Sequence, residues 1–371
     1  MKARQAMLDA PNGTFEIIES EVPQPKTGEL LVRQELCGVC ATDAHMWLGH
    51  LPDTAYPIVL GHEPIGVIEA MGPGVEEDNT GRKLSLGDRI YIVPGIYCGR
   101  CYFCANVREP TLCVHGTGFG FNPYPERPEL HGGWSEYILM DHPRQTFVKF
   151  DNMDAQSGVF LEPLCIGVHA LNRVNLRAGD VAVVQGAGAV GIGALIAAQE
   201  SGAHKVIVVG APATRLELAK EMGADAVIDI EDVTDPARRV ELVREQTNHG
   251  YGADVVVECT GFPQSIPEGI EMLRKGGSYV VAGHFTDRGS VEINPFTHLN
   301  NNHVNIHGAW GGDVAHFIQT LPILESARYN TADVVSHRVP LERALDVCTA
   351  LTTDYRLDGE EIRKVAIEAA L

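Results

Sequence analysis

Four closely spaced cysteines form the clearest group of possible metal ligands in this sequence. They fall within sixteen residues, at Cys98, Cys101, Cys104 and Cys113. Four thiolates at these spacings can close around one tetrahedral zinc ion, which then has no open position for a substrate. The alternative, four unrelated buried cysteines, does not explain this density. The run therefore predicts a structural zinc ion that organises a loop.

A second group of possible metal ligands is dispersed along the chain. Cys40 lies in CGVCATDAH, His62 in the triplet GHE, and Glu162 in LEPL. One thiolate, one imidazole and one carboxylate make a three-ligand zinc site with room for water or an alcohol oxygen. Each residue alone is weak evidence, since a single histidine is more often a packed or capping residue and Glu-Pro is common at turns. Their joint appearance predicts an open, catalytic metal site.

A glycine-rich segment predicts a dinucleotide site. In VAVVQGAGAVGIGALIAAQ, three glycines have the G-x-G-x-x-G spacing directly after an expected strand and at the start of an expected helix. The first glycine permits a tight turn, the second lets the backbone approach a pyrophosphate, and the third lets helix and strand pack closely. Plain turns also show this spacing, so the strand-helix context carries the prediction. The candidate cofactor residues here are Gly186, Gly188, Val190 and Gly191.

The end of the next expected strand leaves the choice between NAD and NADP open. An acidic residue there would hold the ribose 2′-hydroxyl, but KVIVVG ends in Gly210, and Arg215 follows five residues later. The missing carboxylate removes an acceptor for NAD and also a charge that would repel the 2′-phosphate of NADP. Arg215 is a candidate cofactor contact or a solvated residue at a helix start. NAD is favoured because no arginine follows the strand immediately, and NADP is the alternative.

Composition limits the classes of function. The chain has 371 residues, enough for two domains with separate cores, and its formal charge of −20 is spread along the sequence. Nucleic acids and anionic membranes reward basic patches, so neither is an expected partner. No secretory leader and no membrane-spanning apolar run is evident, and we expect a cytoplasmic protein. The odd number of cysteines, nine, with four clustered, favours metal ligands over disulfides.

The pattern of apolar runs changes near residue 165. Before it, short runs such as ELLVRQEL and DRIYIVP, cut by Gly and Pro, are typical of a mostly antiparallel, barrel-like domain. After it, strand-like and helix-like segments alternate, with a helix expected over 266–277 and a strand over 278–284, which predicts a parallel sheet covered by helices on both faces. A helix-like stretch at 313–326 and a strand-like ending are expected to return to the first domain. We therefore expect one domain at 1–164, completed by 314–371, and a second at 165–313.

Successive motifs of the sequence resemble those of the zinc-containing medium-chain dehydrogenases. In chain order they are GVCATDAH, GHEPIGVI, the four-cysteine run, GGWSEY, LEPLCIGVHA and GAGAVG. The resemblance covers nearly the whole chain. It implies an α/β protein with a GroES-like, mostly β catalytic domain and a doubly wound parallel Rossmann domain. None of these motifs carries the identity of the substrate.

The resemblance also implies the ligands of the catalytic zinc. Cys40 and His62 match two of them, and Glu162 stands where polyol and sugar dehydrogenases have a Glu and liver-type alcohol dehydrogenases have a Cys. In the polyol branch the Glu of GHE can also enter the coordination shell, so Glu63 is a rival third ligand or a neighbour of the ligands. Cys37 matches no ligand, and we expect it to be buried and inert. Two zinc ions per chain are expected.

Two further residues match a path for the proton. Thr42 matches the hydroxyl that contacts the substrate oxygen and His45 a proton-relay histidine, although both could instead be local capping groups. When bound, zinc acidifies the alcohol and the nicotinamide takes the hydride. Thr42 would then pass the proton toward His45 or solvent. Family members are usually dimers or tetramers, and VNIHGAW is a candidate pairing strand for a homodimer or homotetramer.

Three features depart from the family's pattern. The gap between Cys104 and Cys113 is one residue longer than usual, Gly210 replaces the acidic residue after the second Rossmann strand, and the loop at 115–132 is long and rich in proline. The longer gap can bulge the loop without loss of the metal. The long loop can give the substrate cleft an unusual wall.

The expected function is a zinc-dependent, NAD(P)-linked dehydrogenase that oxidises a secondary alcohol, polyol or sugar-like substrate to the ketone. The alternatives are an apolar or cyclic secondary alcohol and, less favoured, a primary alcohol. Relatives without catalytic zinc act as quinone or enone reductases or have no catalytic role. They lack the equivalents of Cys40 and His62, which this chain retains.

Overall fold

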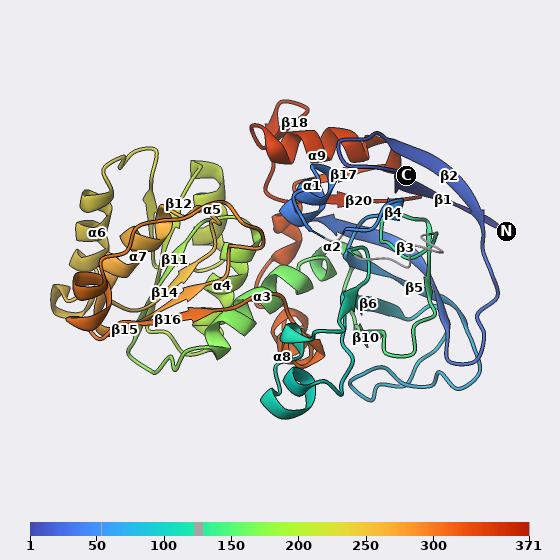
Figure 1. The fold of residues 1–371 in the computed structure, drawn as a ribbon, viewed down its shortest axis with the longest axis horizontal. Helices are drawn as coiled ribbons and strands as arrows, with labels where there is room; N and C mark the ends of the chain where they lie inside the picture. Colours follow the sequence, from blue (N-terminus) through green and yellow to red (C-terminus); the bar gives the residue numbers. More distant parts are fainter. Residues whose placement is uncertain (53, 122–128, 371) are drawn as a thin grey trace. The chain divides into compact units, whose positions relative to one another are not determined.

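The computed structural model describes residues 1–52, 54–121 and 129–370 and divides into two compact units (Figure 1). The first unit comprises Met1–Leu161 and Asp313–Leu371, and the second comprises Glu162–Gly312. Residues 122–128 of the long loop expected at 115–132 lie outside the described residues. Within the described residues, no helix is long and apolar enough to cross a membrane.

The first unit is built on β-sheets whose strands are mostly antiparallel, as predicted. One sheet has the order β2-β1-β4, and a larger one has the order β10-β6-β5-β3-β20-β17, with β9 also paired to β3. Two short pairs, β7-β8 and β18-β19, complete it. The strands are β1 (Lys2–Leu8), β2 (Phe15–Glu21), β3 (Leu30–Val39), β4 (Ile58–Val59), β5 (Glu63–Met71), β6 (Arg89–Val93), β7 (Gly95–Ile96), β8 (Thr117–Gly118), β9 (Tyr137–Met140), β10 (Thr146–Lys149), β17 (His337–Val339), β18 (Arg356–Leu357), β19 (Glu360–Glu361) and β20 (Val365–Ile367).

Four α-helices belong to this unit in the described residues: α1 (Ala41–Trp47), α2 (Ala155–Gly158), α8 (Val314–Glu325) and α9 (Ala344–Thr352). Only α8 was predicted from the sequence. Helix α1 has seven residues, too few for a clear apolar period. Helix α9 does carry a signal, because it buries Ala344, Val347, Cys348 and Leu351 at helical spacing.

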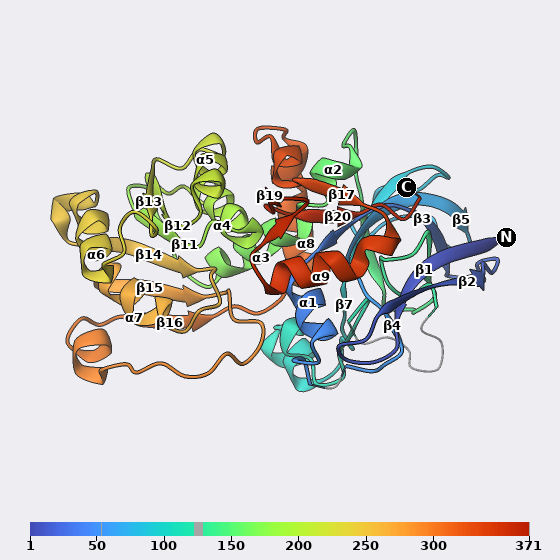
Figure 2. The ribbon, with the colours of Figure 1, turned by 90° about the horizontal axis from the view of Figure 1, so that it is seen from above.

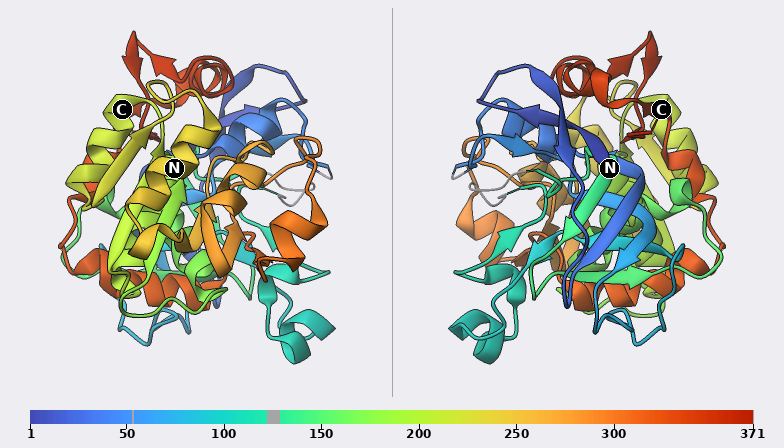
Figure 3. Two further views of the ribbon diagram at one scale, coloured as in Figure 1. Left: turned by 90° about the vertical axis from the view of Figure 1, so that its left-hand side faces the viewer. Right: turned by 90° about the vertical axis from the view of Figure 1, so that its right-hand side faces the viewer.

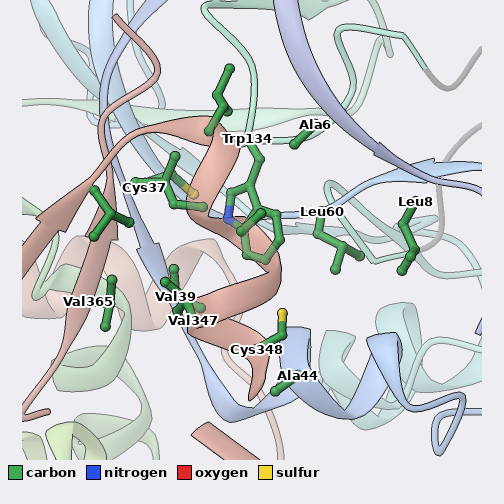
Figure 4. Packing of buried hydrophobic residues seen from close by; sticks show 14 of the residues in the cluster. Ala6, Leu8, Cys37, Val39, Ala44, Leu60, Trp134, Val347, Cys348 and Val365 are labelled. Carbon is green, nitrogen blue, oxygen red and sulfur yellow. The ribbon is translucent and has the colours of Figure 1, made fainter. Parts of the chain in front are cut away.

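The end of the chain returns to the first unit and completes its main sheet. Strand β20 pairs antiparallel with β3, which sets Ile367 opposite Cys37. In both views of Figure 3 the red C-terminal segment lies beside the blue N-terminal strands. The core here gathers around Trp134, Cys37 and Leu60, with Val347 and Cys348 of α9 packed against them (Figure 4). Burial of this apolar surface fixes the strand that leads directly into Cys40.

The second unit is a six-stranded parallel sheet with helices on both faces, as predicted. Its strand order is β13-β12-β11-β14-β15-β16, the doubly wound order in which the direction of winding reverses beside the first strand. The strands are β11 (Val181–Gln185), β12 (Lys205–Gly210), β13 (Ala226–Asp229), β14 (Ala253–Glu258), β15 (Leu273–Val281) and β16 (Asn305–Gly308). The helices are α3 (Leu161–Asn172), α4 (Ala189–Glu200), α5 (Ala213–Glu221), α6 (Pro236–Glu245) and α7 (Ser265–Met272).

Alternate residues of each strand meet helices on opposite faces of the sheet. On β11, Val181 and Val183 pack with apolar residues of α6 and α7, whereas Val184 faces α4, where it lies near Gly191. Helices α4 and α5 thus cover one face, and α6 and α7 cover the other (Figure 2). Both faces are buried, which explains the continuous apolar runs VAVVQ and VIVV.

One predicted boundary in this unit was wrong. The helix expected over 266–277 ends at Met272, and β15 begins at Leu273, well before the expected strand at 278. Leu273 already pairs with Ala253 of β14, and the register then shifts before Ser278 pairs with Val255. Gly276, inside β15, has a φ of +72°, a left-handed conformation that glycine adopts without strain, and it lies where the register shifts.

Candidate active site and metal centres

Three side chains of the first unit converge as one group of possible metal ligands. Cys40 directly precedes α1, His62 precedes β5, and Glu63 is the first residue of β5. Their ligand atoms all lie within 4.8 Å of one another. Strand β3 carries the chain to Cys40 beside β5, since Gly38 pairs with Glu63. The antiparallel pairing therefore brings together residues that are more than twenty positions apart.

Asp43 holds this group in place, and sequence reasoning missed it. Its buried carboxylate accepts hydrogen bonds from the backbone N–H of Cys40, at 2.8 Å, and of Gly61, at 3.3 Å. It also lies 3.2 Å from His62 Nδ1. This contact leaves His62 Nε2 to face a metal, as in carboxylate–histidine–metal arrangements. The signal was present, because an Asp three residues after Cys40 fits a helix start.

The electrostatics of His62 reflect the same neighbours. Burial opposes protonation of the ring, but the charge and hydrogen bond of Asp43, together with Cys40, raise the pKa of His62 well above its usual value. The ring also stacks on Phe121, with centroids 4.2 Å apart. The neighbouring negative charge of Asp43, which holds a proton on the ring, would also attract a metal cation that replaces this proton.

Glu63 forms a buried ion pair that the sequence did not predict. Lys364 Nζ lies 2.5 Å from Glu63 Oε2, and both side chains are almost fully buried. A side chain at Gly38 would collide with Glu63 Oε2 and would lie 2.8 Å from Lys364 Cε. The glycine therefore makes room for the pair. Lys364 comes three hundred residues later and reaches the site only because β20 pairs with β3.

The donor atoms fit a zinc ion. Sulfur, imidazole nitrogen and carboxylate oxygen are the ligand types of zinc sites in proteins. Glu63 Oε1 is buried and has no hydrogen-bond partner among the described residues. A buried carboxylate oxygen without a partner is costly, and a metal ion would satisfy it. The three residues thus form a candidate catalytic zinc site.

Three further predicted site residues lie on two helices, α1 in the first unit and α3 in the second. Thr42 is buried in the first turn of α1, with Oγ1 3.5 Å from Cys40 Sγ. His45 is half-buried in the last turn of α1. Glu162 lies in the first turn of α3, as the first residue of the second unit. Cys37 is fully buried, as predicted, and burial raises the pKa of its thiol well above the usual value.

The four-cysteine run forms the second group of ligands. Its sulfur atoms lie within 4.8 Å of one another. Backbone N–H groups point at them: that of Cys101 donates to Cys98 Sγ at 3.2 Å, and that of Cys98 to Cys113 Sγ at 3.3 Å. A backbone hydrogen bond at Cys104 lowers the pKa of Cys101 to about 6, whereas burial raises the pKa of Cys104 to about 12. The segment from Cys98 to Cys113, called the four-cysteine lobe below, therefore stabilises part of the negative charge that its cysteines must carry to bind a zinc ion.

The extra residue between Cys104 and Cys113 coincides with irregular backbone. A π-helical turn spans Phe103–Val107, and such turns hold one more residue than an α-helical turn. Arg108 follows with a φ of +61°, and a 3₁₀ turn at Pro110–Leu112 leads to Cys113. The four sulfurs stay within 4.8 Å of one another across this irregular backbone.

The predicted dinucleotide segment lies between β11 and α4. Gly186 has a φ of +104°, and a side chain at Gly191 would collide with the Gly186 carbonyl. Nothing lies within 4 Å of the place where a side chain of Gly188 would begin, and Gly188 directly precedes α4. Val190 is in the first turn of α4. The turn, the open backbone and the helix N-terminus together form the surface that a pyrophosphate needs.

Gly210 and Arg215 lie where an adenosine ribose is expected. Gly210 ends β12, and a side chain there would come within 3.0 Å of the Ala187 backbone nitrogen. The end of β12 therefore packs closely against the glycine-rich turn. Arg215 is half-buried in the first turn of α5, which begins at Ala213.

A buried carboxylate shapes the other wall of this region and was also missed. Glu258 ends β14 and accepts hydrogen bonds from the N–H groups of Thr260, at 2.6 Å, Gly261, at 2.8 Å, and Gly283, at 3.2 Å. These bonds fix the loops that follow β14 and β15. In doubly wound sheets, ligands bind at the carboxyl ends of the two strands where the winding reverses, here β11 and β14.

Comparison with known proteins gives consistent results. A family described as alcohol dehydrogenase GroES-like domain matches residues 26–151, and one described as zinc-binding dehydrogenase matches residues 189–326. A 5-exo-hydroxycamphor dehydrogenase from Pseudomonas putida is 32% identical, covering 92% of this chain and 93% of its own. Sorbitol dehydrogenase from Ovis aries is also 32% identical, covering 90% and 89%. An alcohol dehydrogenase structure from Thermotoga maritima matches with a TM-score of 0.92 and 31% identity, and the match covers 100% of each chain.

Proposed function

This chain belongs to the zinc-containing medium-chain alcohol dehydrogenase family, and from that premise we propose how its residues carry out the reaction. The protein is an oxidoreductase that uses zinc and NAD(P) to oxidise a secondary alcohol or polyol to the ketone, reversibly. The observation that carries this function is the group of Cys40, His62 and Glu63, within 4.8 Å of one another, in a chain that also holds the Gly186 turn.

We propose a division of labour between the domains expected from the sequence. Residues 1–164 with 314–371 hold the zinc ions and the substrate, and 165–313 bind the cofactor through Gly186, Gly188, Val190, Gly191, Gly210 and Arg215. A second zinc ion is held by Cys98, Cys101, Cys104 and Cys113. The closeness of those four sulfurs and their backbone hydrogen bonds support this assignment.

In the reaction, the chain's own residues bind, orient and move a proton. When bound, zinc lowers the pKa of the alcohol hydroxyl, and the nicotinamide accepts the hydride that leaves the carbon. Cys40 and His62 would hold the metal, and Asp43 orients His62 through its Nδ1. Thr42 accepts the hydroxyl proton at Oγ1 and passes it toward His45. The C–H electron pair thus leaves as hydride and the O–H hydrogen leaves as a proton, which balances the oxidation.

The third protein ligand is a carboxylate in this proposal. Glu63 has an oxygen without a partner among the described residues, which supports its role, and Glu162 is the alternative that the LEPL motif supports. The pairing of Glu63 with Lys364 bears on the choice, because Lys364 offsets the charge of a carboxylate beside the zinc. Separate Glu63→Gln and Glu162→Gln variants, loaded with cobalt in place of zinc, test it. Only the variant that replaces the metal-binding glutamate should change the visible absorption of the cobalt ion.

For the cofactor we propose NAD, because no arginine follows Gly210 directly and Arg215 lies a turn further along. Gly210 is also the place where a ribose carboxylate is absent, so NADP is the competing choice. Steady-state kinetics with both cofactors decide the question. A kcat/KM at least about tenfold higher with NADP, equivalent to ~1.4 kcal/mol of transition-state stabilisation, would overturn the proposal.

For the substrate we propose a secondary alcohol with an adjacent hydroxyl. A carboxylate ligand is harder than sulfur, and the second hydroxyl of a vicinal diol can donate to Glu162 or Glu63. The similarity to sorbitol dehydrogenase supports a polyol. The test compares kcat/KM for a vicinal diol and its mono-ol analogue in the parent enzyme and in Glu162→Gln. If an unbranched mono-ol is the better substrate of the parent, the diol proposal fails.

A cyclic secondary alcohol is the second candidate, supported by the similarity to a hydroxycamphor dehydrogenase. The two candidates differ in polarity, so a panel of bicyclic alcohols and acyclic polyols separates them. Faster turnover of the bicyclic alcohols, at equal zinc content, favours the second candidate.

We further propose a homodimer or homotetramer in the cytoplasm. Strand β16 lies at the edge of its sheet, and Ile306 and Trp310 are exposed there, which supports pairing with a second copy. The four-thiol lobe needs reduced cysteines, which supports a reducing compartment. Sedimentation of the parent and of Ile306→Lys tests the assembly.

A further inference from the structure

Two histidines at the end of α1 lie in direct contact. Nδ1 of His45 is 3.0 Å from Nδ1 of His50, and the ring centroids are 5.2 Å apart. Two imidazole nitrogens at this distance form a hydrogen bond only when one carries a hydrogen and the other offers a lone pair. At least one ring is therefore neutral, and the shared hydrogen joins the pair.

The backbone at the end of α1 creates this contact. The N–H of Gly49 donates to the carbonyl of Met46, and the N–H of His50 donates to the carbonyl of His45, both at 2.9 Å. Gly49 has a φ of +74°. These two bonds and the left-handed glycine form a Schellman motif, in which the second residue past the helix faces a residue of the last turn.

The chemistry of this helix cap is unusual. An apolar contact frequently joins the two facing positions of a Schellman motif, whereas here His45 and His50 occupy them. The segment HMWLGH therefore encodes both the helix end and a pair of imidazoles. His45 is half-buried and His50 is exposed to solvent.

We propose that His50 carries the substrate's proton from His45 to bulk water. This inference rests on the proposed function, in which oxidation of one alcohol releases one proton toward His45. His45 takes up that proton at one ring nitrogen and gives the hydrogen of Nδ1 to Nδ1 of His50, and His50 releases a hydrogen from Nε2 to water. One proton enters the pair and one leaves it. His50 acts through His45 and does not touch the substrate.

The geometry gives this path an advantage over direct release from His45. Proton transfer requires a donor and acceptor within hydrogen-bond distance, and the motif holds the two Nδ1 atoms 3.0 Å apart. The exposed ring of His50 then exchanges with solvent and buffer. Its removal should slow proton release most when the buffer is dilute.

The test measures hydride and proton release separately in one turnover. Parent and His50→Ala are mixed with NAD and alcohol in dilute buffer, with nicotinamide absorbance reporting hydride transfer and an indicator dye reporting the proton. We expect proton release to be about tenfold slower in His50→Ala, less than the roughly 10²–10⁴-fold cost of losing a primary acid–base group. Added imidazole should restore the rate in a saturable way and leave the parent unchanged.

Two controls separate proton transfer from a structural role. His204→Ala removes another exposed histidine and should leave proton release unchanged. His45→Gln interrupts the path upstream, so the double variant with His50→Ala should be no slower than His45→Gln alone. If His50→Ala is slowed but imidazole does not restore it, His50 is only a helix cap and the proposal is overturned.

The outcomes also distinguish this inference from the proposed function. If the parent forms no reduced nicotinamide with any alcohol, the proposed function fails, and the relay fails with it. If the parent is active and His50→Ala releases protons at the parent rate in dilute buffer, the relay alone is overturned.

Discussion

The four-cysteine lobe and the Cys40 group both bring possible metal ligands together in the first unit, but they do so in different ways. The lobe takes four identical ligands from sixteen consecutive residues, and backbone N–H groups point at its sulfurs. The Cys40 group takes three different side chains from separate segments. Two buried residues support it, since Asp43 contacts His62 and Lys364 pairs with Glu63. The lobe is also more exposed, with Tyr102 67% and Val114 63% accessible.

In the proposed function, the four-cysteine lobe is a closed zinc site and the Cys40 group is an open one. Four thiolates need only a loop of the right length, because each residue supplies the same kind of ligand and no position stays free for a substrate. A site that leaves a position free has fewer ligands, so its remaining ligands must be oriented by other side chains. Asp43 and Lys364 are the side chains that would orient the ligands of such an open site.

The largest expected effect is that replacement of Cys40 abolishes activity, whereas replacement of Cys104 lowers thermal stability. Cys40→Ser should reduce turnover by at least about 10³-fold, because the metal's acidity contributes several kcal/mol to the reaction, while the chain stays folded. Cys104→Ser should instead lower the Tm and leave the turnover of the folded fraction nearly intact, because the lobe organises structure. Steady-state kinetics and thermal unfolding of both variants check this contrast.

The zinc content of the parent and of both variants, measured by elemental analysis, is the control for that comparison. The metal-replete parent should hold about two zinc ions per chain, and each variant should hold one fewer. A parent with one zinc ion would remove one of the two assignments. Near-normal kcat in Cys40→Ser would contradict the proposed mechanism.

The contrast also explains what the sequence could predict. The four cysteines and the Gly186 turn are contiguous motifs, so their spacing alone indicates their structure. Asp43 had a local signal, three residues after Cys40, but the contact with His62 requires the pairing of β3 with β5. Lys364 had no signal, because nothing near it in sequence indicates that β20 would pair with β3.

The elements show the same limit. Alternating strands and helices predicted the parallel sheet, since that pattern is set by local periodicity. Helix α1 was missed because it is short, and α9 was missed although its apolar residues recur at helical spacing. The boundary of α7 was misplaced because Leu273 joins the sheet through a partner twenty residues earlier. Tertiary pairing overrode the local pattern there.

Lys364→Met removes the buried cation that pairs with Glu63 in the Cys40 group. In zinc-depleted protein it should lower the free energy of unfolding by about 3–5 kcal/mol, because it leaves the buried charge of Glu63 without its partner. In zinc-loaded protein the loss should be smaller, since the carboxylate can then face the metal. Urea unfolding with and without zinc measures both values. The matched control is Lys2→Met, which breaks an exposed pair with Glu19 and should change stability by no more than about 1 kcal/mol.

Asp43→Asn tests the other supporting residue of the Cys40 group and should have a smaller effect. The amide can no longer accept from all of the N–H groups of Cys40, Gly61 and His62 that the carboxylate now faces. Loss of such a supporting group weakens metal binding or activity by roughly 10–100-fold. Competition with a chelator measures the zinc affinity of this site and of the four-cysteine lobe in the same protein. An equal loss of affinity at both sites would mean that Asp43 supports the fold and not this metal site.

The smallest expected effect comes from replacing both members of the buried ion pair. Exchange of a buried ion pair for apolar residues of similar volume is often neutral, whereas loss of one partner is costly. Glu63→Met combined with Lys364→Met should therefore bring the zinc-depleted protein back to within about 1 kcal/mol of the parent. Urea unfolding of the parent, both single variants and the double variant gives the coupling between the two side chains. If the double variant is as unstable as Lys364→Met, the shape of the space beside Gly38, and not the charge of the pair, determines the stability of this region. If it is stable but cobalt-loaded protein keeps the parent's visible absorption, Glu63 is a charge partner of Lys364 and not a ligand.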